Sequence, residues 1–134
     1  MNDIVFLDTN IISYLFTGDT RATLYRPLLE NTTAYLSFMT VAEMYFGANR
    51  ARWGQSRRRR LTMFLQGYPV IQSTPEICVL WGRITAACEH QGRRILAADA
   101  WIAACALRFD VPLITHNRKD FEVIPDLRII SENE

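Results

Sequence analysis

Short apolar runs alternate along the chain with longer segments in which apolar residues recur at helical spacing. The runs are continuous and contain β-branched or aromatic residues, which is typical of strands buried on both faces of a sheet. These predicted strands lie at 4–7, 34–37, 68–71, 111–115 and 127–130. The predicted helices lie at 10–15, 22–29, 40–48, 57–65, 75–90 and 97–107.

This order of elements predicts an α/β fold in which a central, mainly parallel β-sheet is flanked by α-helices. No repeat, low-complexity tract or linker divides the 134 residues, so we expect a single domain over 1–134. Ligands of such sheets bind beyond the carboxyl ends of the strands. Asp8-Thr9-Asn10 follows the first predicted strand, and Thr115-His116-Asn117 follows a later one, so functional residues are expected in both segments.

The composition is that of a folded chain, with 49% hydrophobic and 22% charged residues. No apolar run approaches the ~20 residues needed to span a bilayer. The chain opens on Asn2-Asp3 rather than on a basic signal region. We therefore expect a soluble, cytoplasmic protein without a membrane partner.

The three cysteines, Cys78, Cys88 and Cys105, lack Cys-x-x-Cys spacing. Only His90 and His116 are available to join them, so the chain offers no plausible zinc ligand set. Because their sequence surroundings are apolar, we expect all three to be reduced and to lie in or near the core.

The net charge of +1 hides an uneven distribution. No acidic residue lies between Glu43 and Glu76, a stretch that carries +6 and leaves −5 for the rest of the chain. Its cations are all arginines, which can bind phosphate or carboxylate through two parallel hydrogen bonds. They are Arg50, Arg52, Arg57, Arg58, Arg59 and Arg60. This arginine segment is the candidate surface for an anionic partner.

Three acids, Asp8, Glu43 and Asp99, stand in unusually apolar contexts. Burial disfavours an ionised carboxylate, and several carboxylates close together add mutual repulsion. A bound divalent cation relieves both penalties. Oxygen ligands without His or Cys nearby favour Mg²⁺, or Mn²⁺, over zinc.

Each of these acids also has a purely structural interpretation. Asp8 is a good N-cap for the first helix. Thr40 and Glu43 have the spacing of a capping box, in which the glutamate bonds back to the threonine amide. Asp99 is compatible with a position at the edge of its helix face, in solvent or beside the neighbouring arginines Arg93 and Arg94. Taken together and in this order, the three contexts favour a functional site.

Four segments together resemble the PIN-domain ribonucleases, and among them the VapC-type toxins of bacterial toxin–antitoxin pairs. The first contains Asp8 at the end of a strand, and the second combines Glu43 with an aromatic residue and Gly47. The third places Asp99 shortly before Ile102-Ala103-Ala104, and the fourth combines Thr115 and Asn117 with Asp120-Phe121. The segments are 7–10, 40–47, 98–106 and 113–121, and the resemblance extends over residues 4–130.

The resemblance implies a PIN fold with its acids gathered at the carboxyl edge of the sheet. It assigns Asp8 and Asp99 as metal ligands and Glu43 as a ligand or as a residue acting through water. Many relatives carry an acid where this chain has Asn117, so Asp120 is either the fourth carboxylate of the site or a surface acid beside Lys119. Thr115, Asn117 and Asn10 are then residues that orient the site through hydrogen bonds.

The implied activity is Mg²⁺-dependent endonucleolytic hydrolysis of RNA, because carboxylate-bound metal ions activate water and neutralise phosphate charge. The implied partners are RNA, a VapB-type antitoxin and a second copy of the chain in a homodimer. The arginine segment would bind the RNA backbone, the acidic tail of the antitoxin, or both.

Two alternatives stay open on the sequence. One is a PIN-like RNA-binding module without catalysis. The other is a different α/β phosphohydrolase, although Asn10 stands where a haloacid dehalogenase has its second aspartate, and a receiver domain would need a partner acid beside Asp8. No glycine-rich phosphate loop is present in the sequence.

Overall fold

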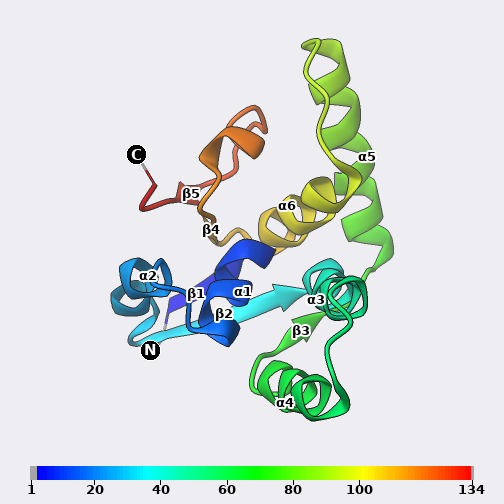
Figure 1. The fold of residues 1–134 in the computed structure, drawn as a ribbon. Coiled ribbons are helices and arrows are strands. Elements are labelled where there is room, and N and C mark those ends of the chain that lie inside the picture. Colours follow the sequence, from blue (N-terminus) through cyan, green and yellow to red (C-terminus); the bar gives the residue numbers. More distant parts are fainter. Residues whose placement is uncertain (1–2, 134) are drawn as a thin grey trace.

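The structure, a computed structural model, describes residues 3–133 and contains a five-stranded parallel sheet with helices on both faces (Figure 1). The strand order is β3-β2-β1-β4-β5. The strands are β1 (Asp3–Leu7), β2 (Thr32–Ser37), β3 (Val70–Ile71), β4 (Leu113–Ile114) and β5 (Ile129–Ile130). The helices are α1 (Thr9–Thr17), α2 (Ala22–Leu29), α3 (Phe38–Arg50), α4 (Gln55–Leu65), α5 (Pro75–His90) and α6 (Ala97–Phe109), with a 3₁₀ helix η1 (Arg118–Asp120). The α/β class predicted from the sequence is confirmed.

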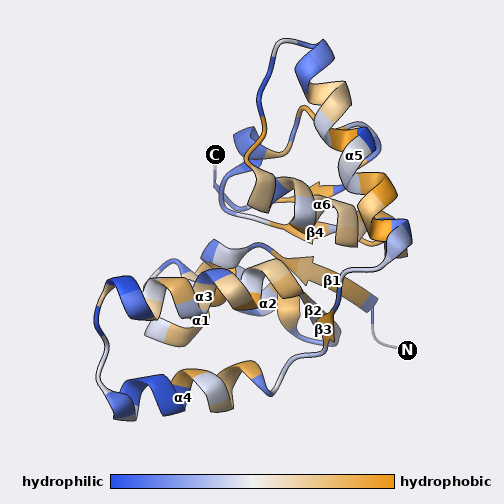
Figure 2. Cartoon of the chain, turned by 90° about the vertical axis from the view of Figure 1, so that its right-hand side faces the viewer, coloured by the Kyte–Doolittle hydropathy of each residue, from blue (hydrophilic) through white to orange (hydrophobic). Residues whose placement is uncertain are grey.

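Each face of the sheet has its own apolar core, because successive side chains of a strand point to opposite faces. Phe6 of β1 and Leu113 of β4 pack with α5 and α6. Leu7 and Ile114, the next residues of the same two strands, pack with α1, α3 and α4. The strands are therefore apolar on both sides, as the continuous runs predicted, and the two helical layers are visible on either side of the sheet in Figure 2.

Two predicted helix starts, those of α4 and α3, lie two residues after the observed ones, and the reason is clear for α3. That helix begins at Phe38, and its N-cap is Ser37, whose hydroxyl accepts the backbone N–H of Met39 at 3.1 Å. The prediction placed the start at Thr40, because serine and threonine are equally good N-caps and both stand in this segment. The chain in fact turns into the helix directly at the end of β2. Thr40 is thereby fully buried inside the first turn.

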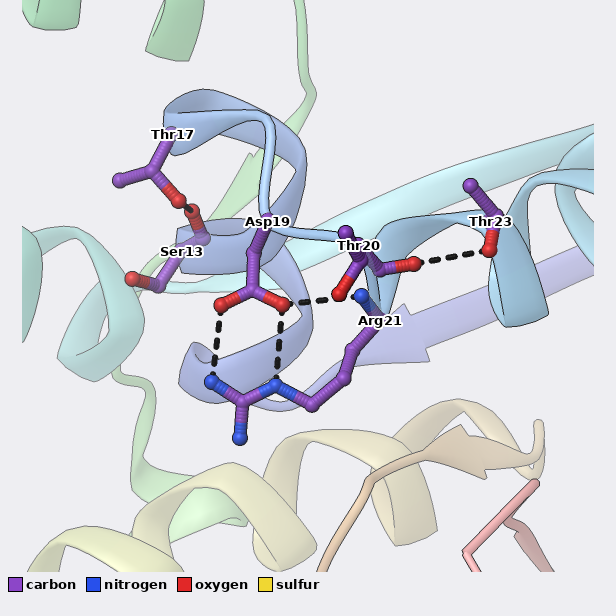
Figure 3. Close-up of polar contacts among 6 residues, drawn as sticks. All are labelled: Ser13, Thr17, Asp19, Thr20, Arg21 and Thr23. Carbon is purple, nitrogen blue, oxygen red and sulfur yellow. Dashed lines mark hydrogen bonds and ion pairs between the residues drawn. The ribbon is translucent and has the colours of Figure 1, made fainter.

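A short polar corner connects α1 to α2 (Figure 3). Gly18 ends α1 with a φ of 74°, a left-handed conformation that glycine adopts without strain. Asp19 and Arg21 then form an ion pair at 2.8 Å. The guanidinium of Arg21 also lies over the ring of Tyr14, 4.1 Å from its centre, so the corner is held to α1 by stacking as well.

The expectation for the cysteines is correct for two of them and wrong for the third. Cys88 and Cys105 are buried, whereas Cys78 is exposed. The reason is helical periodicity: Cys78 follows Ile77, which faces the core from α5, and the next position along a helix points elsewhere. Within the described residues, no helix has the length and apolar character required to cross a bilayer.

Candidate metal and nucleic-acid site

Asp8 directly follows β1, at the carboxyl edge of the sheet, and is only 6% exposed. One carboxylate oxygen accepts the backbone N–H of Thr9 at 2.8 Å, so Asp8 is the N-cap of α1. The other oxygen accepts the hydroxyl of Thr115 at 2.7 Å, which connects the ends of β1 and β4. The capping interpretation is thus confirmed for Asp8, and the cap holds its carboxylate in one orientation at the sheet edge.

Glu43 is half-buried in α3 and faces Thr9 rather than its own helix start. The Thr9 hydroxyl lies 2.6 Å from Oε1 of Glu43 and 3.1 Å from the hydroxyl of Thr40. Because a carboxylate only accepts, Thr9 donates to Glu43, and Thr40 donates to Thr9. The capping-box interpretation is therefore wrong: α3 begins before Thr40, and the Glu43 carboxylate is bound by a different helix.

Asp99 and Asp120 approach from the other side of the site. Asp99 is half-buried in the first turn of α6, and Asp120 is exposed at the end of η1. Both line one hollow of about 250 Å³. Helix η1 lies just beyond β4, so the acids come from four elements, α1 with its cap, α3, α6 and η1, that meet near the carboxyl edge.

The electrostatics show that these four acids lie close enough to influence one another. Burial raises the pKa of Asp8 to about 6; the hydrogen bonds from Thr115 and Thr9 oppose that rise, and the charges of Glu43 and Asp120 add to it. Burial likewise raises the pKa of Asp99 to about 7, with further contributions from Asp8, Asp120 and Glu43. Such mutual repulsion in a partly buried site is the situation that a bound cation relieves.

The three predicted orienting residues have different contacts. Thr115 is fully buried and donates to Asp8, as described above. Asn117 contributes its backbone N–H, which donates to the Thr115 hydroxyl at 3.0 Å. The side-chain oxygen of Asn10 accepts the backbone N–H of His116 at 3.5 Å, a long bond that ties α1 to the turn after β4.

The donor chemistry fits a hard divalent cation. The converging groups are carboxylates supported by hydroxyls, the oxygen ligands that Mg²⁺ and Mn²⁺ prefer. Across residues 3–133, no three His, Cys, Asp or Glu side chains lie close enough together to hold one ion directly. Mg²⁺ is usually bound in proteins through one or two carboxylates and keeps several of its waters.

The arginine segment lies apart from the acids, mainly on α4 (Figure 1). Three of its members have side-chain contacts, and that of Arg50 is with the ring of Phe46, 5.3 Å from its centre. Arg58 donates to the backbone oxygen of Trp53 at 2.8 Å and to Oδ1 of Asn49 at 2.8 Å, so it holds the end of α3. Arg57 stacks on the ring of Trp53 at 3.9 Å from its centre. Arg59 and Arg60 are exposed and remain candidates for an anionic partner, as do Arg50 and Arg52.

A comparison of the sequence with protein families identifies this arrangement. The family model described as PIN domain matches residues 5–127, nearly the whole chain. The chain belongs to the PIN-domain family. Ribonuclease VapC1 of Haemophilus influenzae (strain R2866) is 35% identical over 127 residues, which cover 93% of this chain and 95% of that protein.

Solved structures agree with this PIN-domain assignment. VapBC-1 from nontypeable Haemophilus influenzae is 32% identical with a TM-score of 0.84, and the match covers 96% of this chain and 97% of that one. VapBC2 from Rickettsia felis, bound to a DNA fragment from their promoter, is 26% identical with a TM-score of 0.82, over 96% and 98% of the two chains. The family and fold predicted from the four segments are confirmed.

Sequence reasoning missed two hydroxyls of this PIN domain, Thr9 and Thr40. Thr9 follows Asp8 directly, so its position near the site was readable from the sequence. Its contact with Glu43, 34 positions away, depends on how α1 packs on α3, and no local pattern encodes that packing. Thr40 was considered only as a helix cap.

Proposed function

We propose that this chain is a single PIN domain acting as a divalent-metal-dependent endoribonuclease, the VapC-type toxin of a toxin–antitoxin pair. The observation that carries the proposal is the convergence of Asp8, Glu43, Asp99 and Asp120: burial raises the pKa of Asp8 and Asp99, and the charges of neighbouring acids in the cluster add to both rises. A PIN-domain assignment and VapC relatives support it. Its substrate is cellular RNA, so the protein acts in the cytoplasm.

In this proposal the cation is Mg²⁺, with Mn²⁺ as a substitute. Asp8 and Asp99, the two acids with raised pKa, would hold it, with Glu43 and Asp120 as the supporting carboxylates of the same cluster. When bound, the ion lowers the pKa of water and neutralises charge that develops on the phosphate. Asn10, Thr115 and Asn117 orient the site from outside it.

The protein's own contribution is to hold the carboxylates in place before the substrate arrives. Thr115 and the amide of Thr9 occupy one lone-pair direction on each oxygen of Asp8, which stops the carboxylate from rotating. The hydroxyl of Thr9 likewise holds one carboxylate oxygen of Glu43. Removing a hydrogen bond that orients a metal ligand typically lowers metal affinity or activity by about 10–100-fold.

The partners in this proposal are a VapB-type antitoxin and a second copy of the chain. VapBC complexes are the solved structures to which the fold is similar. The exposed arginines Arg50, Arg52, Arg59 and Arg60 would bind the RNA backbone, and an acidic antitoxin segment would compete for the same cations. We expect the antitoxin to inhibit cleavage by covering this surface.

The test is cleavage of a structured RNA pool by the purified protein in Mg²⁺. We expect cleavage to stop in chelator and to resume on addition of Mg²⁺ or Mn²⁺. The Asp99→Asn variant should lose at least about 100-fold in rate, because it removes a direct ligand. Asp126→Asn is the matched control, since Asp126 is exposed and its φ of 67° is one that asparagine also tolerates.

Cleavage that persists in chelator and in Asp99→Asn would contradict the metal-dependent mechanism. RNA binding by the wild-type protein without any cleavage in Mg²⁺ would instead indicate a binding module, the alternative left open by the sequence.

A further inference from the structure

The hollow that Asp99 and Asp120 line has a second, cationic wall. Arg93, Arg94 and Lys119 line the same hollow of about 250 Å³. Arg93 and Arg94 lie in the connection between α5 and α6, and Lys119 is the middle residue of η1. Three cations thus share one small cavity with two members of the acid cluster.

These cations are not neutralised by the acids beside them. The ion pairs among residues 3–133 are Arg21–Asp19 and Arg128–Asp110, both elsewhere in the fold. All three cationic side chains of the hollow are exposed, and within this part of the chain none of them donates a side-chain hydrogen bond. Arg58 of α4, by contrast, donates a side-chain hydrogen bond to the backbone oxygen of Trp53. The charges of the hollow are therefore available to a ligand.

The backbone beneath these cations is firmly held. Gly92, with a φ of 71°, ends α5, and the N–H of Arg93 donates to the carbonyl of Cys88 at 2.9 Å. Ile95 then packs into the core formed with α5 and α6. On the other wall, the residue after η1, Phe121, is fully buried in the same core. Two separately anchored segments therefore present their cations toward one cavity.

The position of the hollow sets it apart from the arginine segment. In both Figure 1 and Figure 2, α4 lies on the opposite side of the sheet from η1 and the α5–α6 connection. A cluster of carboxylates repels the phosphate on which it acts, so a nuclease needs cations close by to hold the neighbouring part of the chain. Binding energy from such non-reacting groups is what positions the reacting one.

We propose that this hollow binds the RNA phosphate adjacent to the scissile one, with Arg93, Arg94 and Lys119 as positioning residues. The inference rests on the proposed ribonuclease function and adds to it a defined phosphate subsite. An RNA strand carries an anionic group on both sides of the bond that is cut, so it can occupy the cationic wall while its neighbouring phosphate lies at the acids. The exposed arginines of α4 would then contact more distant nucleotides.

The first measurement is binding of a short, fluorescently labelled single-stranded RNA in chelator, where no cleavage occurs. We expect Arg93→Gln/Arg94→Gln to weaken binding by about tenfold and to reduce the salt dependence by about one phosphate contact. Lys119→Gln, from the other wall, should weaken it in the same direction. Arg26→Gln/Arg83→Gln is the matched control, because it removes the same charge from exposed positions on α2 and α5.

The second measurement locates the phosphate. Once the cleavage position in one RNA is mapped, a neutral methylphosphonate replaces the phosphate on either side of it. At one of these two positions, the methylphosphonate should weaken RNA binding by the wild type and by the control variant. Arg93→Gln/Arg94→Gln already binds RNA more weakly, and the same substitution should weaken its binding no further. Its KM should rise more than its kcat falls, and its melting temperature should match that of the control.

Unchanged RNA binding in both Arg93→Gln/Arg94→Gln and Lys119→Gln would overturn the subsite. A wild type whose RNA affinity changes with neither methylphosphonate would overturn it as well. If the variants instead lose affinity only for a glutamate-rich peptide, the hollow is an antitoxin contact and the proposal is wrong. A wild type that cuts no RNA contradicts the proposed function, whereas variants that bind and cut RNA normally contradict only the subsite.

Discussion

The hydroxyl of Thr9 donates to Oε1 of Glu43 at 2.6 Å and so joins α1 to α3 beside the acid cluster. The same residue's backbone N–H binds the carboxylate of Asp8 at 2.8 Å. One threonine therefore positions two acids that are far apart in the sequence. The arrangement makes Thr9 a positioning residue, and its contact with Glu43 depends on the packing of α1 on α3.

Replacing Thr9 with valine keeps the shape of the side chain and removes the donor. We expect the rate of RNA cleavage to fall by about 10–100-fold, because the Glu43 carboxylate loses its orientation. Thr9→Ser restores the hydroxyl and should recover most of the rate. The control is Thr23→Val on α2, whose hydroxyl bonds only to a backbone oxygen of its own helix start. Equal activity in Thr9→Val and Thr23→Val would contradict this role.

The raised pKa of Asp99 predicts a pH-dependent stability in metal-free protein. Its value rises from 3.8 to about 7 on folding, so the folded state binds this proton more tightly than the unfolded state. The free energy of unfolding therefore falls as the pH rises from about 4 to about 7. Asp99→Asn should match the wild type near pH 4 and melt roughly 3 °C or more higher at pH 8. Asp126→Asn should follow the wild type throughout, and parallel melting curves for all three would contradict the prediction.

Mg²⁺ should stabilise the wild type by binding only the folded acid cluster. At saturating concentration we expect the melting temperature to rise by roughly 5 °C at pH 8, which is above the raised pKa of both Asp8 and Asp99. Asp99→Asn and Asp8→Asn should show little of this shift, while Asp126→Asn should show all of it. Differential scanning fluorimetry with and without chelator measures the difference. A shift of the same size in every variant would indicate that Mg²⁺ binds elsewhere.

Neighbouring arginines of α4 should separate into structural and binding roles. Arg58→Ala should lower the free energy of unfolding by about 1–3 kcal/mol, because it leaves the carbonyl oxygen of Trp53 and the side-chain oxygen of Asn49 without their donor. Arg59→Ala, one position further on an exposed surface, should change stability by less than about 0.5 kcal/mol. Urea unfolding measures both. Under the proposed function, Arg59→Ala weakens RNA binding instead, and equal losses of stability would contradict the distinction.

Tyr25 connects the turn after β4 to the end of the described chain. Its buried hydroxyl lies 2.6 Å from Nδ1 of His116 and accepts the N–H of Glu132 at 3.2 Å. Tyr25→Phe should cost about 1–2 kcal/mol and speed hydrogen exchange at Glu132. Unchanged exchange there would contradict the contact.

The elements of the fold were predictable because burial imposes a readable pattern. The runs around Phe6 and Leu113 are apolar on consecutive residues. The structure explains this, because neighbouring residues of each strand pack into the two different cores on opposite faces of the sheet. Boundaries were less predictable where two residues could serve the same purpose. Ser37 and Thr40 are both competent N-caps, and only the end of β2 decides between them.

The acids themselves were predictable because a carboxylate in an apolar context is costly without a compensating partner. Asp8, Glu43 and Asp99 stood out on that ground. The match of the PIN-domain family model to residues 5–127 agrees with the family that the four segments indicated. The roles of individual residues in metal and RNA binding stay predictions that the experiments above test.

The sequence by itself therefore determined the class of fold and the acids that define the candidate site, since periodicity and burial cost are properties of local residue order. It determined the family through the resemblance of four short segments. The tertiary structure decided which groups meet. Thr9 reaches Glu43 only because α1 packs on α3, and Arg93, Arg94 and Lys119 share a cavity with Asp99 only because η1 and the α5–α6 connection anchor in one core. Contacts between distant segments depend on packing geometry, which no short stretch of the chain specifies on its own.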